Sequence, residues 1–204
     1  MADVQCKTFD ENNIRLVVKD STTSNGEVVM EKDDKNLNID EKKLRGKLGT
    51  SHYSRKIEIY IPKEYKGDIS FNNGVGDIKL EGINCESLSI KTGTGDSDIL
   101  NVNAEDLVLK SGVGDIRLNL NKSPKNMDIK CGTGGCDINI EEVKGNLTYD
   151  GGVGDTTIRI PENAPVKIKT SSGVGDSDID AKTSGENKYT FDLDNGLGDI
   201  KVTN

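Results

Sequence analysis

Apolar and polar residues alternate in short segments along most of the chain, and these segments recur at a regular distance. In the first copy, Ile69 and Phe71 lie five and three residues before a glycine, and Leu80 lies six residues after it. The equivalent positions in all copies are apolar, with Thr170 as the one exception. Alternation with a period of two is typical of a strand with one buried face. The pattern predicts two half-buried strands per repeat, one on each side of the glycine.

The glycine opens a short Gly-x-Gly phrase, usually followed by Asp. It occurs seven times, starting at Gly74, Gly93, Gly112, Gly132, Gly152, Gly173 and Gly196. The distances between these glycines are 19, 19, 20, 20, 21 and 23 residues. Such a narrow spread indicates a repeat protein.

A repeat of this length cannot bury its own apolar stripe, but stacked repeats bury a continuous one. We therefore predict an all-β, single-chain β-solenoid, similar to a β-helix, with seven rungs of 19–23 residues. The two glycines of each corner indicate a positive φ or crowding that excludes a Cβ atom. The Val, Thr or Leu between them fits a side chain that points inward. Whether the rung has two or three sides stays open.

Residues 14–66 also alternate, but they lack the Gly-x-Gly corner. Strands are predicted at 15–19, 27–32, 36–40 and 56–61, the last one ended by Pro62. We interpret residues 1–66 as an irregular, β-rich N-terminal cap and residues 67–204 as the solenoid, within one continuous domain. The last rung would then form an open end with Lys201 as its main protection, and this exposed edge offers a site for end-to-end self-association.

Composition and charge narrow the range of functions. Only 32% of the residues are apolar, 30% are charged and Trp is absent, so order must come from regular stacking. A net charge of −8 argues against a nucleic-acid or anionic-membrane binder. No apolar stretch is long enough for a membrane span, and the start of the chain lacks the features of a signal peptide.

The Gly-x-Gly-Asp phrase, the alternating strands around it and the Ile-Pro strand endings at Ile61-Pro62 and Ile160-Pro161 resemble a known family over about residues 14–204. It is a bacterial family of β-strand-repeat proteins, a domain of unknown function named "putative adhesin". The resemblance implies a single-chain β-helix-like fold and a tie to the cell envelope or its stress response. It implies no catalytic residues.

The aspartates after the second glycine are the sharpest polar feature. They are Asp77, Asp96, Asp115, Asp155, Asp176 and Asp199, and only Gly135 interrupts the series. In a stacked solenoid these carboxylates would form a ladder with a spacing of about 5 Å. We expect them to accept hydrogen bonds from turn amides, and calcium is the alternative, because Ca²⁺ prefers several oxygen ligands.

Cys131 and Cys136 flank the one corner that lacks the aspartate. By register both occupy inward-facing positions. Buried thiols, a disulfide across the corner and a soft metal site are the three interpretations, and buried thiols are favoured because free Cys behaves as a small apolar residue.

One basic segment interrupts the acidic chain. Residues 42–56 carry six cationic side chains and no acidic one: Lys42, Lys43, Arg45, Lys47, Arg55 and Lys56. This loop is a candidate binding site for a phosphate-bearing or carboxylated envelope polymer. The alternative is a solvated crossover loop without a ligand.

Catalysis has little support, because His52 is the only histidine and no Ser-His-Asp arrangement is available elsewhere. We expect a non-catalytic structural or interaction module of the bacterial cell envelope, without a cofactor. The alternatives are a calcium-binding β-roll-like module, a self-assembling envelope scaffold and a polysaccharide-cleaving β-helix with a carboxylate pair.

Overall fold

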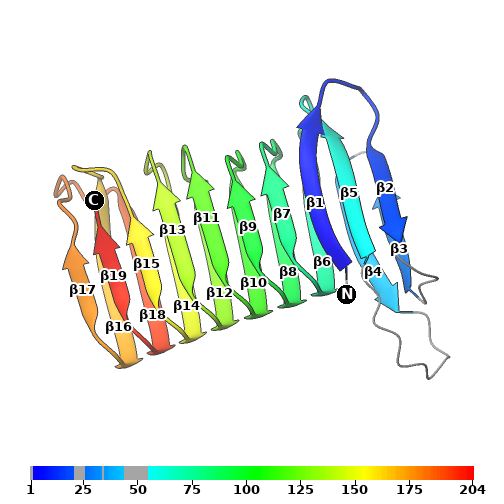
Figure 1. Ribbon diagram of the computed structural model, residues 1–204. Helices are drawn as coiled ribbons and strands as arrows, with labels where there is room; N and C mark the ends of the chain where they lie inside the picture. Colours follow the sequence, from blue (N-terminus) through cyan, green and yellow to red (C-terminus); the bar gives the residue numbers. More distant parts are fainter. Residues whose placement is uncertain (1, 21–25, 34, 44–54) are drawn as a thin grey trace.

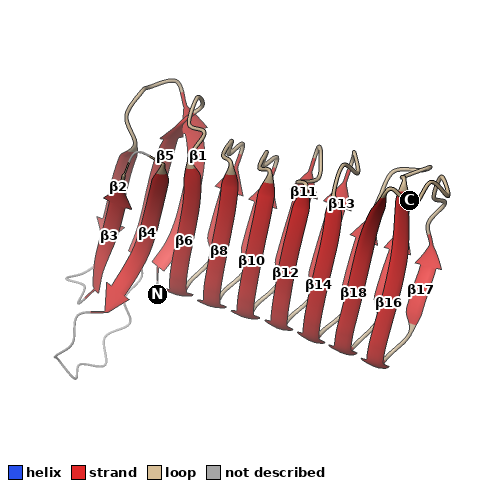
Figure 2. Ribbon diagram, turned by 180° about the vertical axis from the view of Figure 1, so that it is seen from behind, coloured by secondary structure: helices blue, strands red, loops and turns tan. Residues whose placement is uncertain are grey.

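The computed structural model describes residues 2–20, 26–33, 35–43 and 55–204, and these residues form strands, turns and loops without any helix (Figures 1 and 2). The prediction of an all-β fold is confirmed. Among the described residues there is accordingly no helix that is long and apolar enough to cross a membrane.

Two long sheets lie face to face and enclose one apolar core. In spatial order, sheet A contains β17 (Ser177–Asp180), β19 (Ile200–Thr203), β15 (Thr156–Arg159), β13 (Cys136–Ile140), β11 (Ile116–Leu120), β9 (Ser97–Leu100), β7 (Ile78–Glu81), β1 (Ala2–Phe9), β5 (Arg55–Pro62) and β2 (Arg15–Asp20). Sheet B contains β16 (Val166–Val174), β18 (Tyr189–Leu197), β14 (Asn146–Val153), β12 (Asn126–Thr133), β10 (Asp106–Val113), β8 (Ser87–Thr94), β6 (Asp68–Val75), β4 (Asn36–Lys43) and β3 (Gly26–Lys32).

From β6 onward, each rung consists of a strand of sheet B, a Gly-x-Gly corner and a strand of sheet A. The rung thus has two strand-bearing sides, and loops return the chain to sheet B along the opposite edge (Figure 1). Neighbouring strands of successive rungs are parallel, for example β10 beside β12. We call the two long edges of the molecule the corner side and the loop side.

Both expected reasons for the two corner glycines apply. The second glycine of the phrase has a positive φ, which is 137° at Gly114. In every copy but that of Gly74, the first glycine packs against the backbone of a neighbouring rung, and a Cβ atom on Gly112 would lie 2.5 Å from the carbonyl oxygen of Gly93. In these copies only glycine fits either position without strain.

The residue between the glycines does not point inward, and this prediction is wrong. Val113, Val153 and Leu197 are 49%, 46% and 47% exposed. Continued alternation would place this side chain inward, but the alternation ends at the turn, where the chain leaves one sheet and the side chain lies beyond the edge of the core. Ser111, two residues before Val113, is buried.

The rungs do not stack in sequence order at the C-terminal end. The last rung, β18 and β19, lies between the rung of β14 and β15 and the rung of β16 and β17. Lys201 is therefore on an inner strand, with β15 and β17 on its two sides, and the prediction that the last rung forms the open end is wrong.

Core composition gives a physical reason for this order. The inward positions of the inner rung include Phe191, Leu193 and Val202, all fully buried. The end rung has Thr170 at the position equivalent to Leu193. Placing the more polar rung at the end leaves the more apolar rung covered on both sides, which removes more apolar surface from water.

The N-terminal part continues both sheets. The residue ranges of the strands predicted within residues 14–66 agree, to within a few residues, with those of β2, β3, β4 and β5. β1 is an additional strand that the sequence pattern did not reveal. β1 lies between β5 and β7 and is parallel to both. Only β2 and β3 run antiparallel to their neighbours, at the far end of the stack (Figure 2).

Candidate binding groove

The aspartates of the corner form a ladder of hydrogen bonds from rung to rung. Asp77 Oδ1 accepts the backbone N–H of Asp96 at 2.9 Å, and Asp96 Oδ1 accepts the N–H of Asp115 at 2.9 Å. At the C-terminal end, Asp155 accepts from Asp199 at 3.0 Å and Asp199 accepts from Asp176 at 2.9 Å. Each of these four carboxylates thus accepts an amide of the next rung in the stack, rather than an amide of its own turn.

Two further residues belong to this series: one extends the ladder at its N-terminal end, and the other interrupts it. Asp3 of β1 extends it, since its Oδ1 accepts the N–H of Asp77 at 3.3 Å. Gly135 has no side chain that could accept the N–H of the next corner, although its own N–H donates to Asp115 Oδ1 at 2.9 Å. Among the described residues no group of three or more His, Cys, Asp or Glu side chains could hold a metal ion.

Cys131 and Cys136 are both buried free thiols near the phenol of Tyr149. Burial raises the pKa of both thiols, and the charge of Asp115 adds to the effect at Cys131. Their inward orientation agrees with the register, and the disulfide and the metal stay predictions.

The basic segment lies partly outside the described residues. Arg45, Lys47 and His52 lie outside the described residues, and Lys42, Lys43 and Arg55 are placed only by their backbone, in β4 and β5. Lys56 is exposed, and its Nζ lies 3.6 Å from Glu58 Oε1.

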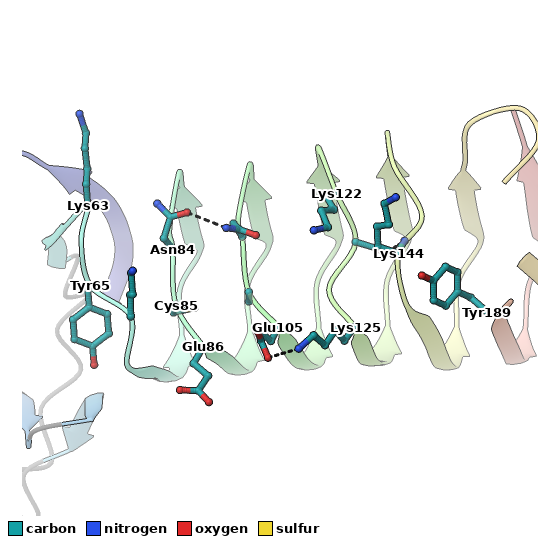
Figure 3. Close-up of a pocket in the computed structure, with 14 residues that line it drawn as sticks. Lys63, Tyr65, Asn84, Cys85, Glu86, Glu105, Lys122, Lys125, Lys144 and Tyr189 are labelled. Carbon is teal, nitrogen blue, oxygen red and sulfur yellow. Dashed lines mark hydrogen bonds and ion pairs between the residues drawn. The ribbon is translucent and has the colours of Figure 1, made fainter. Parts of the chain in front are cut away.

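A groove that the sequence did not predict runs along the loop side (Figure 3). Its volume is about 680 Å³, and it crosses the loops that lead from sheet A back to sheet B. Tyr65 stands near one end and Tyr189, the first residue of β18, near the other (Figure 3). Between them, Asn103 Nδ2 donates to Asn84 Oδ1 at 3.4 Å across two neighbouring loops.

Lysines dominate the charge of the groove. Five lysines and two glutamates line it: Lys63, Lys66, Lys122, Lys125, Lys144, Glu86 and Glu105. The whole chain carries a net charge of −8, so the lining of the groove has a local charge of the opposite sign. Such a local excess of one charge raises the concentration of oppositely charged ligands near the surface.

The lysines differ in how far protein carboxylates neutralise them. Lys125 Nζ lies 2.6 Å from Glu105 Oε2, and this hydrogen bond raises the pKa of the lysine. Lys144 is held in the same way by Glu142 at 2.7 Å, and Lys63 by Asp10 at 2.7 Å. Within the part of the chain that the structure describes, Lys66 and Lys122 have no such carboxylate partner. These two are the ammonium groups available to a ligand.

Two half-buried groups mark the end of the groove near β6. Burial raises the pKa of Tyr65, and Asp68 adds to this shift. Burial also raises the pKa of Cys85 to about 12, again with Asp68 as the second cause. Both groups are therefore neutral near pH 7, and the cationic character of the groove comes from its lysines.

The family model described as Toastrack DUF4097 matches residues 1–204, the full length of the chain. The chain belongs to the Toastrack DUF4097 family. The resemblance inferred from the Gly-x-Gly-Asp repeats is thereby confirmed. A comparison of this Toastrack DUF4097 chain with curated proteins gives no match.

Two solved structures are similar to this Toastrack DUF4097 chain. One is a "putative cell adhesion protein" from Clostridium sporogenes, with 17% identity, a TM-score of 0.46 and coverage of 99% of this chain and 87% of the other. The second is a "putative adhesin" from Bacteroides fragilis, with 15% identity, a TM-score of 0.48 and coverage of 98% and 88%.

The groove of the Toastrack DUF4097 chain had a weak signal in the sequence. Lys66, Lys125 and Lys144 each lie one or two residues before a strand of sheet B, in the loops of three different rungs. Alignment of the loops, rather than of the Gly-x-Gly corners, would have placed these lysines on one edge.

Proposed function

We propose that this chain is a non-catalytic, adhesin-like interaction module of the bacterial cell envelope, and that it holds an extended anionic polymer along the loop side. The observation that carries the proposal is the lysine-lined groove, with Lys66 and Lys122 free of carboxylate partners among the described residues. The ligand class is a phosphate-bearing or carboxylated envelope polymer. The groove provides ammonium groups for binding, and the bound polymer undergoes no chemical reaction.

The distribution of charge across the molecule supports one binding edge. The corner side carries the aspartate ladder, whose exposed members include Asp77, Asp115 and Asp155. An anionic polymer is repelled there and attracted to the groove, whose lining contains more lysines than glutamates. The repeated rungs give a rigid support on which the lysines lie in a row.

Binding of polyphosphate and of alginate, measured by titration calorimetry at low salt, tests the proposal. These probes carry phosphate and carboxylate groups, and neutral dextran is the uncharged control. We expect both anionic polymers to bind the wild-type chain, with affinity that falls as salt increases, since exposed charges are screened. Dextran should not bind.

Reversing the charge of two groove lysines tests whether the polymer binds in the groove. Lys66→Glu with Lys122→Glu should weaken binding of the anionic polymer by roughly tenfold or more, equal to about 1.4 kcal/mol. The matched control is Lys91→Glu with Lys110→Glu, which makes the same charge change at two exposed lysines on neighbouring strands of sheet B. Equal losses in both variants, or no binding by the wild-type chain, would contradict the groove as the binding site.

A further inference from the structure

The C-terminal end of the stack is open. β16 and β17 are the last strands of their sheets, so their outer edges carry unpaired backbone groups in the described part of the chain. All four side chains of β17 are exposed. Ile179 is 42% exposed, whereas Ile158, at the equivalent position of an inner rung, is fully buried. The core therefore ends here without a cover.

The two edges at this end have opposite charges. The outward side chains of β17 include Asp178 and Asp180, and those of β16 include Lys167 and Lys169. All four are exposed. An acidic edge in sheet A thus lies beside a basic edge in sheet B, on the same rung.

We propose that a second copy of this chain covers this end, and that a two-fold axis parallel to the strands relates the two copies. Rotation about such an axis places sheet A of one copy in line with sheet B of the other. β17 then pairs with β16 of the partner subunit, and β16 with its β17. The two strands run in opposite directions on either side of the corner, so both new pairs are antiparallel. The contact is self-complementary and closes as a dimer.

Symmetry also fixes the register of these pairs. A rotation about an axis along the strands keeps every residue at its distance from the corner. Lys169 lies three residues before Ser172 and Asp180 three residues after Ser177, and these two serines flank the corner. Asp180 therefore lies opposite Lys169 of the partner subunit, and the pair occurs twice. Opposite charges at facing positions stabilise paired strands.

The same arrangement covers the exposed end of the apolar core. The inward side chains of β17 meet those of the partner's β16, so Ile179 is covered by Thr170 and Ile168 of the partner subunit. An axis perpendicular to the sheets would instead pair β17 with its own copy and place acidic edges against each other. The charges of the two edge strands therefore favour the two-fold axis that runs parallel to the strands. This interface is separate from the loop-side groove and does not depend on the proposed function.

Sedimentation velocity of the purified chain over a range of concentrations tests the dimer. We expect the wild-type mass to rise to that of a dimer and to stop there. Lys169→Glu and Asp180→Lys should each raise the dimer dissociation constant by roughly tenfold or more, since each creates two like-charged contacts. Lys110→Glu, an exposed lysine on an inner strand, is the control and should leave dimerisation unchanged.

Mixing the two variants separates a specific contact from local damage. Lys169 faces Asp192 on its own sheet, so Lys169→Glu also adds repulsion within one chain. An equimolar mixture of Lys169→Glu and Asp180→Lys chains restores both opposite-charge pairs, and we expect it to dimerise again. A monomer at all concentrations, growth beyond a dimer or failure of the mixture to associate would overturn the proposal. Lys66→Glu with Lys122→Glu should dimerise normally, whatever its polymer binding.

Discussion

At the residue scale, three glycines around neighbouring corners differ in what a methyl group would meet. Gly114 has a φ of 137°, and a Cβ atom there would lie 2.1 Å from the carbonyl oxygen of Gly95. Gly112 has the close contact without the positive φ. Gly135 has neither, because its nearest neighbour would be Asp115 Oδ1 at 3.6 Å. Backbone strain and close packing are therefore separable by alanine substitution.

We predict a ranked loss of stability for these three positions. Gly114→Ala should cost more than about 2 kcal/mol, because it combines a strained φ with a clash against backbone. Gly112→Ala should cost about 1–3 kcal/mol from the clash alone. Gly135→Ala should be neutral or stabilising by up to about 1 kcal/mol, since it lowers the entropy of the unfolded chain. Urea unfolding measures all three, and an equal loss at Gly135 would contradict the assigned causes.

The corner residue shows where sequence reasoning failed at this scale. The pattern predicted both strands of the rung and both reasons for the glycines, because these depend on local alternation and backbone sterics. It placed Val113 inward, although the side chain is half exposed. Alternation stops at the corner, where the chain changes sheets, so the strand pattern no longer tells which side a residue faces.

At the element scale, the order of the rungs is decided by competition among whole strand pairs. Both of the last two rungs contain alternating strands, so alternation alone does not show which of them is outermost. The polar exception at Thr170 was visible in the sequence, but its consequence required comparing complete rungs. Phe191 and Leu193 of β18 face the core, and β18 occupies the inner position while β16 lies at the end of the sheet.

The cost of truncating one isoleucine should depend on which rung carries it. Ile158 of β15 is fully buried, whereas Ile179 of β17 occupies the same register position and is 42% exposed. We expect Ile158→Ala to cost about 2–5 kcal/mol and Ile179→Ala less than about 1 kcal/mol in the monomer. Urea unfolding at a concentration low enough to keep the chain monomeric provides the measurement. Equal costs would contradict the observed order of the rungs.

At the scale of the whole molecule, the aspartate ladder of the corner side and the lysine-lined groove of the loop side have opposite charges. The corner side presents carboxylates that accept amide N–H groups from rung to rung, and the loop side presents lysines around a groove. The aspartate series was predictable from the sequence because it follows the period of the repeat. The lysines left only a weak signal, since they come from loops of unequal sequence and do not follow the period of the corners.

The carboxylate ladder spans most of the stack, so any calcium bound there would stabilise the entire fold. A ligand at a hundred times its dissociation constant adds about 2.7 kcal/mol to a state that alone binds it. In the structure, however, Asp77 and Asp96 each direct Oδ1 to a backbone amide of the next rung. These amides offset the repulsion between neighbouring carboxylates and occupy an oxygen that a metal would need.

We therefore predict that millimolar Ca²⁺ leaves the thermal unfolding midpoint where it is in chelator. Mg²⁺ at the same concentration controls for ionic strength. Asp96→Asn should lower the midpoint equally with and without calcium, because an amide oxygen is a weaker acceptor than a carboxylate for the N–H of Asp115. A midpoint several degrees higher in Ca²⁺ but not in Mg²⁺, and lost in Asp96→Asn, would instead assign the ladder to metal binding.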